Sequence, residues 1–123
     1  MKENHLTSFF QHGTTEILAA RFASFKQDHP EKWIELEVES LFQLQSMPLA
    51  HVDVVMLDNM SLEAIRESVT WSRSEVPHVQ IEVSGNVSLD TIGQYQGSGV
   101  DRISVGSLTH SVKAMDLSLL FDL

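Results

Sequence analysis

The sequence predicts an α/β fold in which about four parallel strands alternate with helices. Segments with strand periodicity alternate with segments of helical periodicity, in the order β, α, β, α, β, α, β after one leading helix. Helices of this length between strands are typical of parallel pairs joined by right-handed crossovers. Hydrophobic residues make up 42% of the 123 residues and charged residues 20%, which is the composition of a globular domain.

The first predicted element is an amphipathic helix over residues 14–28. Leu18, Phe22 and Phe25 recur at helical spacing and predict its buried face. The helix is expected to end before Pro30, because the residue that precedes a proline disfavours the helical region and proline cannot extend the hydrogen-bond ladder.

Four segments have the composition of strands. The first alternates apolar and acidic residues, which indicates one packed face and one polar face. The second is rich in β-branched residues, as expected of a buried parallel strand. The predicted strands span residues 34–38, 52–57, 79–83 and 102–105.

The helices between these strands are predicted from their caps. Ser40 and Gln43 have the spacing of a capping box, so a helix is expected to begin there and to end before Pro48. Ser61 is a suitable N-cap for the next helix, whose apolar residues share one face. Apolar residues between positions 89 and 95 predict a further short helix.

Two architectures fit this order of elements, a doubly wound sheet and part of a (β/α) barrel. Four strands are fewer than a closed barrel needs. The sequence therefore predicts an incomplete barrel with open sheet edges if the barrel is correct.

Composition and charge exclude several classes of function. Seventeen acidic residues against eight basic ones give a net charge of −9, and the bases are scattered along the chain, so nucleic-acid binding is not expected. Zero cysteines exclude disulfides and thiolate sites. The sequence contains no apolar run long enough to span a membrane and no signal-peptide pattern at its start, and we expect a cytoplasmic protein without membrane contact.

Polar residues and glycines follow the predicted strands at the carboxyl ends, about one βα unit apart. Glu37 and Asp58 suit Mg²⁺, which takes one or two carboxylates together with substrate phosphate oxygens; the alternative is that they are solvated or capping residues. Ser84-Gly85-Asn86 and Gly106-Ser107 could bring backbone N–H groups to a phosphate, although tight turns also need glycine. The six histidines lack zinc-ligand spacing.

The same segments, read in order, resemble the motifs of quinolinate phosphoribosyltransferase. Lys2-Glu3-Asn4-His5 resembles the family's K-[DE]-N-H segment. The other four matching segments are residues 35–41, which resemble E-V-E-V-E-N-L, residues 56–60, which resemble M-L-D-N-[FM], residues 82–87, which resemble E-[VA]-S-G-[GN]-[VI], and residues 103–111, which resemble I-S-V-G-A-L-T-H-S.

The resemblance implies transfer of a phosphoribosyl group from phosphoribosyl pyrophosphate to quinolinate with decarboxylation, a step of NAD biosynthesis that yields nicotinate mononucleotide, pyrophosphate and CO2. It implies that Glu37 and Asp58 hold Mg²⁺ with the substrate and that Lys2 contacts substrate charge. The residues implied for binding the 5′-phosphate are Ser84, Gly85, Asn86, Gly106, Ser107 and His110.

The resemblance covers only the C-terminal part of the family's barrel domain. The N-terminal sandwich domain, and the early barrel segment whose arginine, lysine and histidine residues bind quinolinate, have no counterpart here, so residues 1–123 are expected to form a partial domain. The family is usually dimeric, which implies a homodimer or pairing with a complementary subunit. Two alternatives remain: a non-catalytic remnant that binds phosphate or pairs with another subunit, and a related phosphoribosyltransferase-like protein of metal-transport operons.

Overall fold

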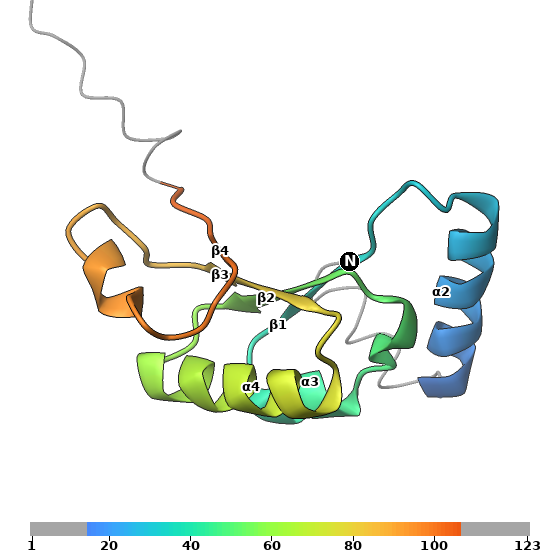
Figure 1. The fold of residues 1–123 in the computed structure, drawn as a ribbon, viewed down its shortest axis with the longest axis horizontal. Helices are drawn as coiled ribbons and strands as arrows, with labels where there is room; N and C mark the ends of the chain where they lie inside the picture. Colours follow the sequence, from blue (N-terminus) through green and yellow to red (C-terminus); the bar gives the residue numbers. More distant parts are fainter. Residues whose placement is uncertain (1–14, 107–123) are drawn as a thin grey trace, which may run out of the picture.

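A computed structural model of the chain describes residues 15–106, which form one sheet with helices packed on it (Figure 1). The order of elements along the chain matches the predicted alternation. The elements are α2 (Thr15–Asp28), β1 (Glu35–Val38), α3 (Leu41–Ser46), the 3-10 helix η1 (Leu49–His51), β2 (Val54–Asp58), α4 (Leu62–Glu75), β3 (Gln80–Ser84), the 3-10 helix η2 (Ile92–Tyr95) and β4 (Arg102–Ile103).

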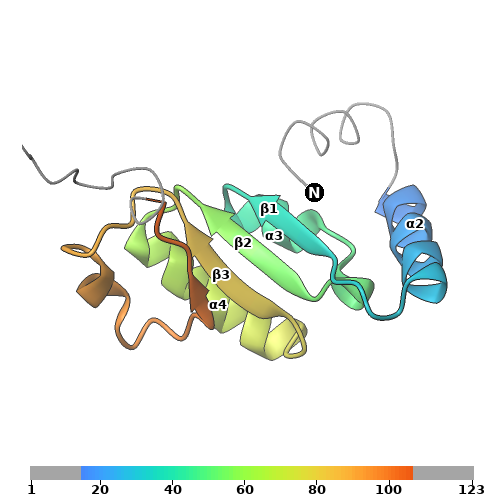
Figure 2. The ribbon, with the colours of Figure 1, turned by 90° about the horizontal axis from the view of Figure 1, so that it is seen from above.

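The four strands are parallel and lie in the order β1-β2-β3-β4, so each strand pairs with its successor along the chain. Their carboxyl ends therefore lie at one edge of the sheet, as the arrowheads in Figure 2 show. In the part of the chain that the structure describes, β1 and β4 are the outer strands and the sheet does not close. The predicted fold class and the predicted open edges are confirmed.

Helices α3 and α4 cover one face of this sheet (Figure 1). The side chains that point toward them are fully buried, including Leu36, Leu57 and Ile81, each with 0% of its surface exposed. Within residues 15–106, no helix covers the opposite face. Because side chains alternate along a strand, that opposite face carries the polar residues between the buried ones, and we call it the polar face.

Helix α2 lies beside the amino-terminal end of the sheet and contacts η1 (Figures 1 and 2). Leu18 and Phe22 are buried as predicted, whereas Phe25 is 37% exposed and stacks at an angle on His29, with 5.1 Å between ring centroids. Phe25 is therefore less buried than the rest of the predicted apolar face, and it lines the space between α2 and the start of β1. The helix ends at Asp28, before Pro30 as predicted.

The predicted helix caps are confirmed. The Ser40 hydroxyl accepts a hydrogen bond from the Gln43 amide at 3.2 Å, and the Gln43 side chain accepts one from the Glu39 amide at 2.7 Å. The Ser61 hydroxyl accepts from the Ala64 amide at 3.2 Å. These contacts satisfy amide groups that the first turn of each helix leaves without a partner, and they fix where α3 and α4 leave the sheet.

Two predicted elements are shorter or less regular than expected. The sequence predicts β4 over residues 102–105, but its strand geometry spans only Arg102–Ile103, although the Ser104 amide still donates to the Val83 carbonyl at 2.8 Å. The helix predicted between positions 89 and 95 is a single 3-10 turn, Ile92–Tyr95. Leu89 is 67% exposed, so that segment buries too little apolar surface to stabilise a longer helix.

Candidate functional site

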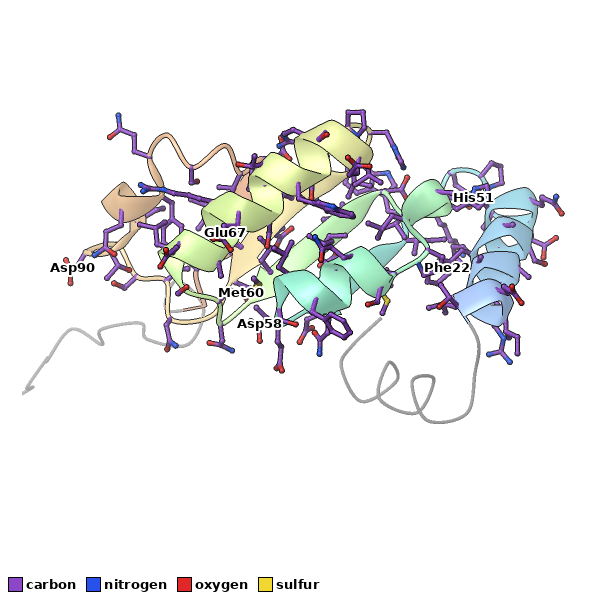
Figure 3. All side chains as sticks on the ribbon, turned by 90° about the horizontal axis from the view of Figure 1, so that it is seen from below. Phe22, His51, Asp58, Met60, Glu67 and Asp90 are labelled. Atoms are coloured by element: carbon purple, nitrogen blue, oxygen red, sulfur yellow. The ribbon has the colours of Figure 1, made fainter. Side chains whose placement is uncertain are left out.

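The register of the strands decides which of the predicted residues come together. Asp58 pairs with Ser84 across β2 and β3, and Glu37 pairs with Met56, two residues before Asp58. Side chains at paired positions of a parallel sheet point to the same face, so Glu37, Asp58 and Ser84 all lie on the polar face. Figure 3 labels Asp58 and Met60 at the carboxyl end of β2, while Phe22 and His51 lie near its amino end.

The turn after β3 follows directly from the Asp58–Ser84 pair. Gly85 and Asn86 have positive φ angles of 83° and 52°, so the chain reverses through left-handed backbone there. In the described residues, the amide N–H groups of Gly85 and Asn86 donate to no protein acceptor. Two free N–H groups at the end of a strand suit an anion such as a phosphate.

Asn59 joins this turn to the Asp58 carboxylate, and sequence reasoning gave it no role. Its amide donates to the Ser84 carbonyl at 3.0 Å, its side-chain Nδ2 donates to Asp58 Oδ2 at 2.8 Å, and its Oδ1 accepts from Asn86 Nδ2 at 3.2 Å. Its φ of 52° is also left-handed. The signal in the sequence was an asparagine immediately after a strand, a residue that tolerates this conformation better than most.

Glu82 is a second residue whose position sequence reasoning did not use. It lies on the polar face in register with Arg102 and is only 8% exposed. The Ser104 hydroxyl donates a hydrogen bond to Glu82 Oε1, and Arg102 Nη1 lies 3.9 Å from Glu82 Oε2. Arg102 also stacks on the Trp33 ring, with its guanidinium carbon 4.5 Å from the ring centroid. The contact between Glu82 and Ser104 ties β4 to β3 just before Gly106.

The two carboxylates at this edge fit a metal ion whose remaining ligands come from a bound substrate or from water. Within residues 15–106, no three or more His, Cys, Asp or Glu side chains are grouped so that they could enclose a metal. Glu37 and Asp58 supply two carboxylates on one face, which matches the way Mg²⁺ binds with a phosphate substrate rather than in an all-protein cage.

Two other carboxylates lie at the amino-terminal side of the sheet and have a structural role. Asp53 accepts hydrogen bonds from the Ile34 amide at 2.6 Å and from Lys26 at 2.9 Å. Partial burial alone would raise the pKa of Asp53, but these hydrogen bonds and the Lys26 charge outweigh it and lower that pKa.

Asp101 repeats this arrangement before β4. It accepts from the Ile81 amide at 2.7 Å and from Arg73 at 2.7 Å, and its pKa is lowered in the same way against the effect of burial. Both carboxylates therefore join the start of one strand to a neighbour, away from the predicted site.

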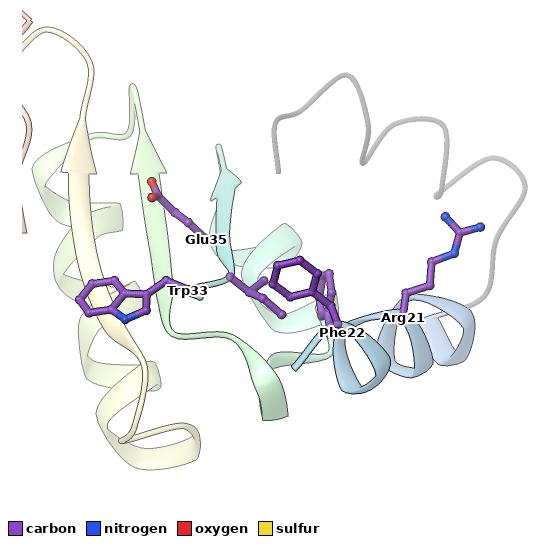
Figure 4. Close-up of a pocket in the computed structure, with 6 residues that line it drawn as sticks. Arg21, Phe22, Trp33 and Glu35 are labelled. Atoms are coloured by element: carbon purple, nitrogen blue, oxygen red, sulfur yellow. The ribbon is translucent and has the colours of Figure 1, made fainter. Parts of the chain in front are cut away.

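A cavity of about 370 Å³ also lies at the amino-terminal side, between α2 and the start of β1. Figure 4 shows four of the residues that line it, Arg21 and Phe22 on α2 and Trp33 and Glu35 at the start of β1. Its lining is mostly apolar and it lies away from the turn after β3. The cavity therefore lies elsewhere than the carboxyl edge of the sheet, where strand register and hydrogen bonds bring the predicted site residues together.

The predicted site residues fall into two groups. The structure places Glu37, Asp58, Ser84, Gly85 and Asn86 at one edge, and Gly106 follows β4 at the same edge. Lys2, Ser107 and His110 lie outside the described residues.

The fold and this edge together define an α/β domain with carboxylates and a glycine turn at the ends of parallel strands, the arrangement by which such domains bind phosphorylated ligands. The chain belongs to the family described as quinolinate phosphoribosyl transferase, C-terminal domain, whose model matches residues 1–120. No helix within residues 15–106 has both the length and the hydropathy that crossing a bilayer requires.

Similar proteins carry the corresponding names. The chain is 34% identical over 119 residues to nicotinate-nucleotide pyrophosphorylase [carboxylating] of Rattus norvegicus, covering 97% of this chain and 38% of the rat protein. The structure of the nicotinate-nucleotide pyrophosphorylase from Francisella tularensis matches with a TM-score of 0.71 at 37% identity, over 96% of this chain and 38% of that one. NadC from Streptococcus pyogenes matches with a TM-score of 0.73 at 37% identity, over 94% and 38%. The chain thus spans about 38% of the length of these relatives.

Proposed function

We propose that the carboxyl edge of this sheet binds phosphoribosyl pyrophosphate together with Mg²⁺. In this proposal Glu37 and Asp58 hold the Mg²⁺ complex of the substrate, and the N–H groups of the Ser84-Gly85-Asn86 turn bind its 5′-phosphate. Gly106, Ser107 and His110 complete the phosphate site, and Lys2 contacts substrate charge. The observation that carries the proposal is the Asp58–Ser84 register, which puts a carboxylate and two free N–H groups at adjacent strand ends.

The corresponding reaction is phosphoribosyl transfer to quinolinate with decarboxylation, giving nicotinate mononucleotide, pyrophosphate and CO2, as the names of the relatives suggest. The chemistry agrees with the donor set. Pyrophosphate leaves more readily when its negative charge is neutralised, and Mg²⁺ held by the carboxylates would neutralise it. An oxocarbenium-like ribosyl centre is stabilised by nearby negative charge.

Quinolinate needs cationic partners for two carboxylates, and three of the described cations already have acidic partners. Lys26 and Arg73 pair with Asp53 and Asp101 at the amino-terminal side, and Arg102 lies between Glu82 and Trp33. Binding of the dicarboxylate is therefore proposed for a complete site, to which residues outside 15–106 contribute.

The test is calorimetric titration of the purified chain with phosphoribosyl pyrophosphate in the presence of Mg²⁺. Saturable binding is expected for the native chain, and loss of it for the variant that combines Glu37→Gln with Asp58→Asn. The matched control is Asp53→Asn, a carboxylate at the other end of β2, which should bind as the native chain does. Equal binding by native and double-variant chains, or no binding by a natively folded chain, would disprove the proposal.

A second candidate function is a non-catalytic domain that binds phosphate or pairs with another subunit. The observation in its favour is the open sheet, since within residues 15–106 both outer strands and the polar face have no covering element. The two candidates differ in turnover. Formation of nicotinate mononucleotide by the purified chain with saturating quinolinate and phosphoribosyl pyrophosphate would exclude the second candidate, and phosphate binding without product would favour it.

A further inference from the structure

We propose that Asn59 is a positioning residue that holds the Asp58 carboxylate and the Ser84-Gly85-Asn86 turn as one unit. The proposal deepens the function proposed above and rests on it, because the two parts are the proposed binding groups for metal and phosphate. Asn59 makes three hydrogen bonds, one to Asp58 and two to the turn.

The backbone of the junction between Asn59 and the turn is left-handed. Asn59 and Asn86 both have φ of 52°, and Gly85 lies between β3 and Asn86 with φ of 83°. Asparagine tolerates left-handed backbone better than most residues with a side chain, and surrounding contacts hold it there. Here the contacts are mutual, since Asn86 donates to Asn59 Oδ1 and the Asn59 amide donates to the Ser84 carbonyl.

The Asn59 side chain lies directly against Gly85. A Cβ atom on Gly85 would lie 2.2 Å from Asn59 Oδ1, 2.6 Å from its Cγ and 2.9 Å from its amide nitrogen. The Asn59 side chain therefore occupies the space where any other residue at position 85 would place its side chain. Glycine at position 85 is therefore what allows Asn59 to take this position beside the turn.

The Asp58 carboxylate is bound at one of its two oxygens. Asn59 Nδ2 donates to Asp58 Oδ2, which restricts the rotation of the carboxylate, while in the described residues Oδ1 has no hydrogen-bond donor. A carboxylate held by one oxygen and free at the other is oriented for a cation. The placement of the carboxylate relative to a bound phosphate matters for affinity, since a small displacement of a binding group weakens the interaction strongly.

The test uses two glycine substitutions that keep the left-handed backbone at both positions. Asn59→Gly removes the side-chain contacts to Asp58 and Asn86 and retains the amide that donates to Ser84. Asn86→Gly removes only the contact to Asn59. Binding of phosphoribosyl pyrophosphate with Mg²⁺ is measured by calorimetry for the native chain, both single variants and the double variant, and the free chains are examined by NMR relaxation.

Asn59→Gly is expected to weaken binding about tenfold or more, with a cooperative unfolding transition retained. Asn86→Gly is expected to weaken binding in the native background and to have little further effect after Asn59→Gly, because the two residues act through the same contact. A residue that only stabilised the fold would lower the free energy of unfolding and leave the affinity of the folded chain unchanged. Asp53→Asn, at the opposite end of β2, serves as the control for a loss of stability without a change in affinity.

The NMR measurement decides the proposal independently of ligand binding. Order parameters of the Gly85 and Asn86 amides should be near the rigid value of about 0.85 in the native chain and should fall toward about 0.6 in Asn59→Gly. If the native chain binds and Asn59→Gly binds equally well, the positioning role is overturned and the proposed function stands. If the native chain does not bind, the proposed function fails, and unchanged order parameters in Asn59→Gly would overturn the positioning role as well.

Discussion

Among the glycines within residues 15–106, Gly85 is the one at which an added methyl group should lower the free energy of unfolding most. In Gly85→Ala, the added Cβ would meet Asn59 Oδ1 at 2.2 Å and the Asn59 amide nitrogen at 2.9 Å, and the φ of 83° adds strain of its own. The backbone strain costs about 1 to 2 kcal/mol. Displacing Asn59 breaks up to three hydrogen bonds, each worth about 0.5 to 1.5 kcal/mol, so the total loss is expected to be about 2.5 to 6.5 kcal/mol.

Gly97 provides a matched control for this prediction. It also has a positive φ, 73°, but a Cβ there would have no atom within 4 Å, so Gly97→Ala should lose only the strain of about 1 to 2 kcal/mol. The free energy of unfolding of each variant is measured by urea denaturation monitored by far-UV circular dichroism. The difference between the two variants reports the contact with Asn59. Equal losses of stability in Gly85→Ala and Gly97→Ala would show that the contact with Asn59 does not contribute.

Three further predictions concern the stability of the same sheet. The free energy of unfolding should decrease as the pH falls below about 4. The pKa of Asp53 is lower in the folded chain than in the unfolded chain, so its carboxylate stabilises the fold above the unfolded pKa, and this stability is lost as the carboxylate is protonated. Asp53→Asn should reduce the pH dependence, measured by urea denaturation at several pH values. Ser61→Ala should cost about 1 kcal/mol through loss of the α4 cap, measured in the same way. Leu57→Ala, at a position with 0% exposure, should cost about 2 to 5 kcal/mol in the same assay.

Exposed substitutions serve as controls for these three predictions. Asp90→Asn should leave the acid dependence unchanged, Glu67→Ala should leave α4 nearly as stable as before, and Leu89→Ala, at a residue 67% exposed, should cost little. If the pH dependence of the free energy of unfolding is unchanged in Asp53→Asn, the hydrogen bonds of Asp53 with Lys26 and the Ile34 amide do not stabilise the fold as proposed. Losses near zero for Ser61→Ala or Leu57→Ala would show that the cap or the core position contributes less than its contacts imply.

The strands and helix caps could be predicted from the sequence because their causes are local. Alternation of apolar and acidic residues before Val38 reflects one packed and one polar face, and the structure has both. The Ser40 and Gln43 pair and the Ser61 cap act within a few residues of the chain, so their spacing alone indicates where α3 and α4 begin.

The features that could not be predicted depend on contacts between distant segments. The roles of Asn59 and Asn86 arise from a side-chain contact across 27 positions of the chain, and no local pattern indicates it. Glu82 could have been found from the alternation of β3, but its contacts with Ser104 and Arg102 depend on the pairing with β4. The exposure of Phe25 could not be predicted, because periodicity indicates which face of a helix is apolar and not how much of that face other elements cover.

The location of the proposed phosphate site can be tested most directly by titrating the isotopically labelled chain with phosphoribosyl pyrophosphate and Mg²⁺ while its amide NMR signals are followed. If the carboxyl edge binds the ligand, the largest shifts are expected at Asp58, Gly85, Asn86 and Gly106, with the indole signal of Trp33 unchanged. Shifts confined to Trp33 and the neighbouring cavity beside α2, or no shifts in a natively folded chain, would contradict binding at this edge.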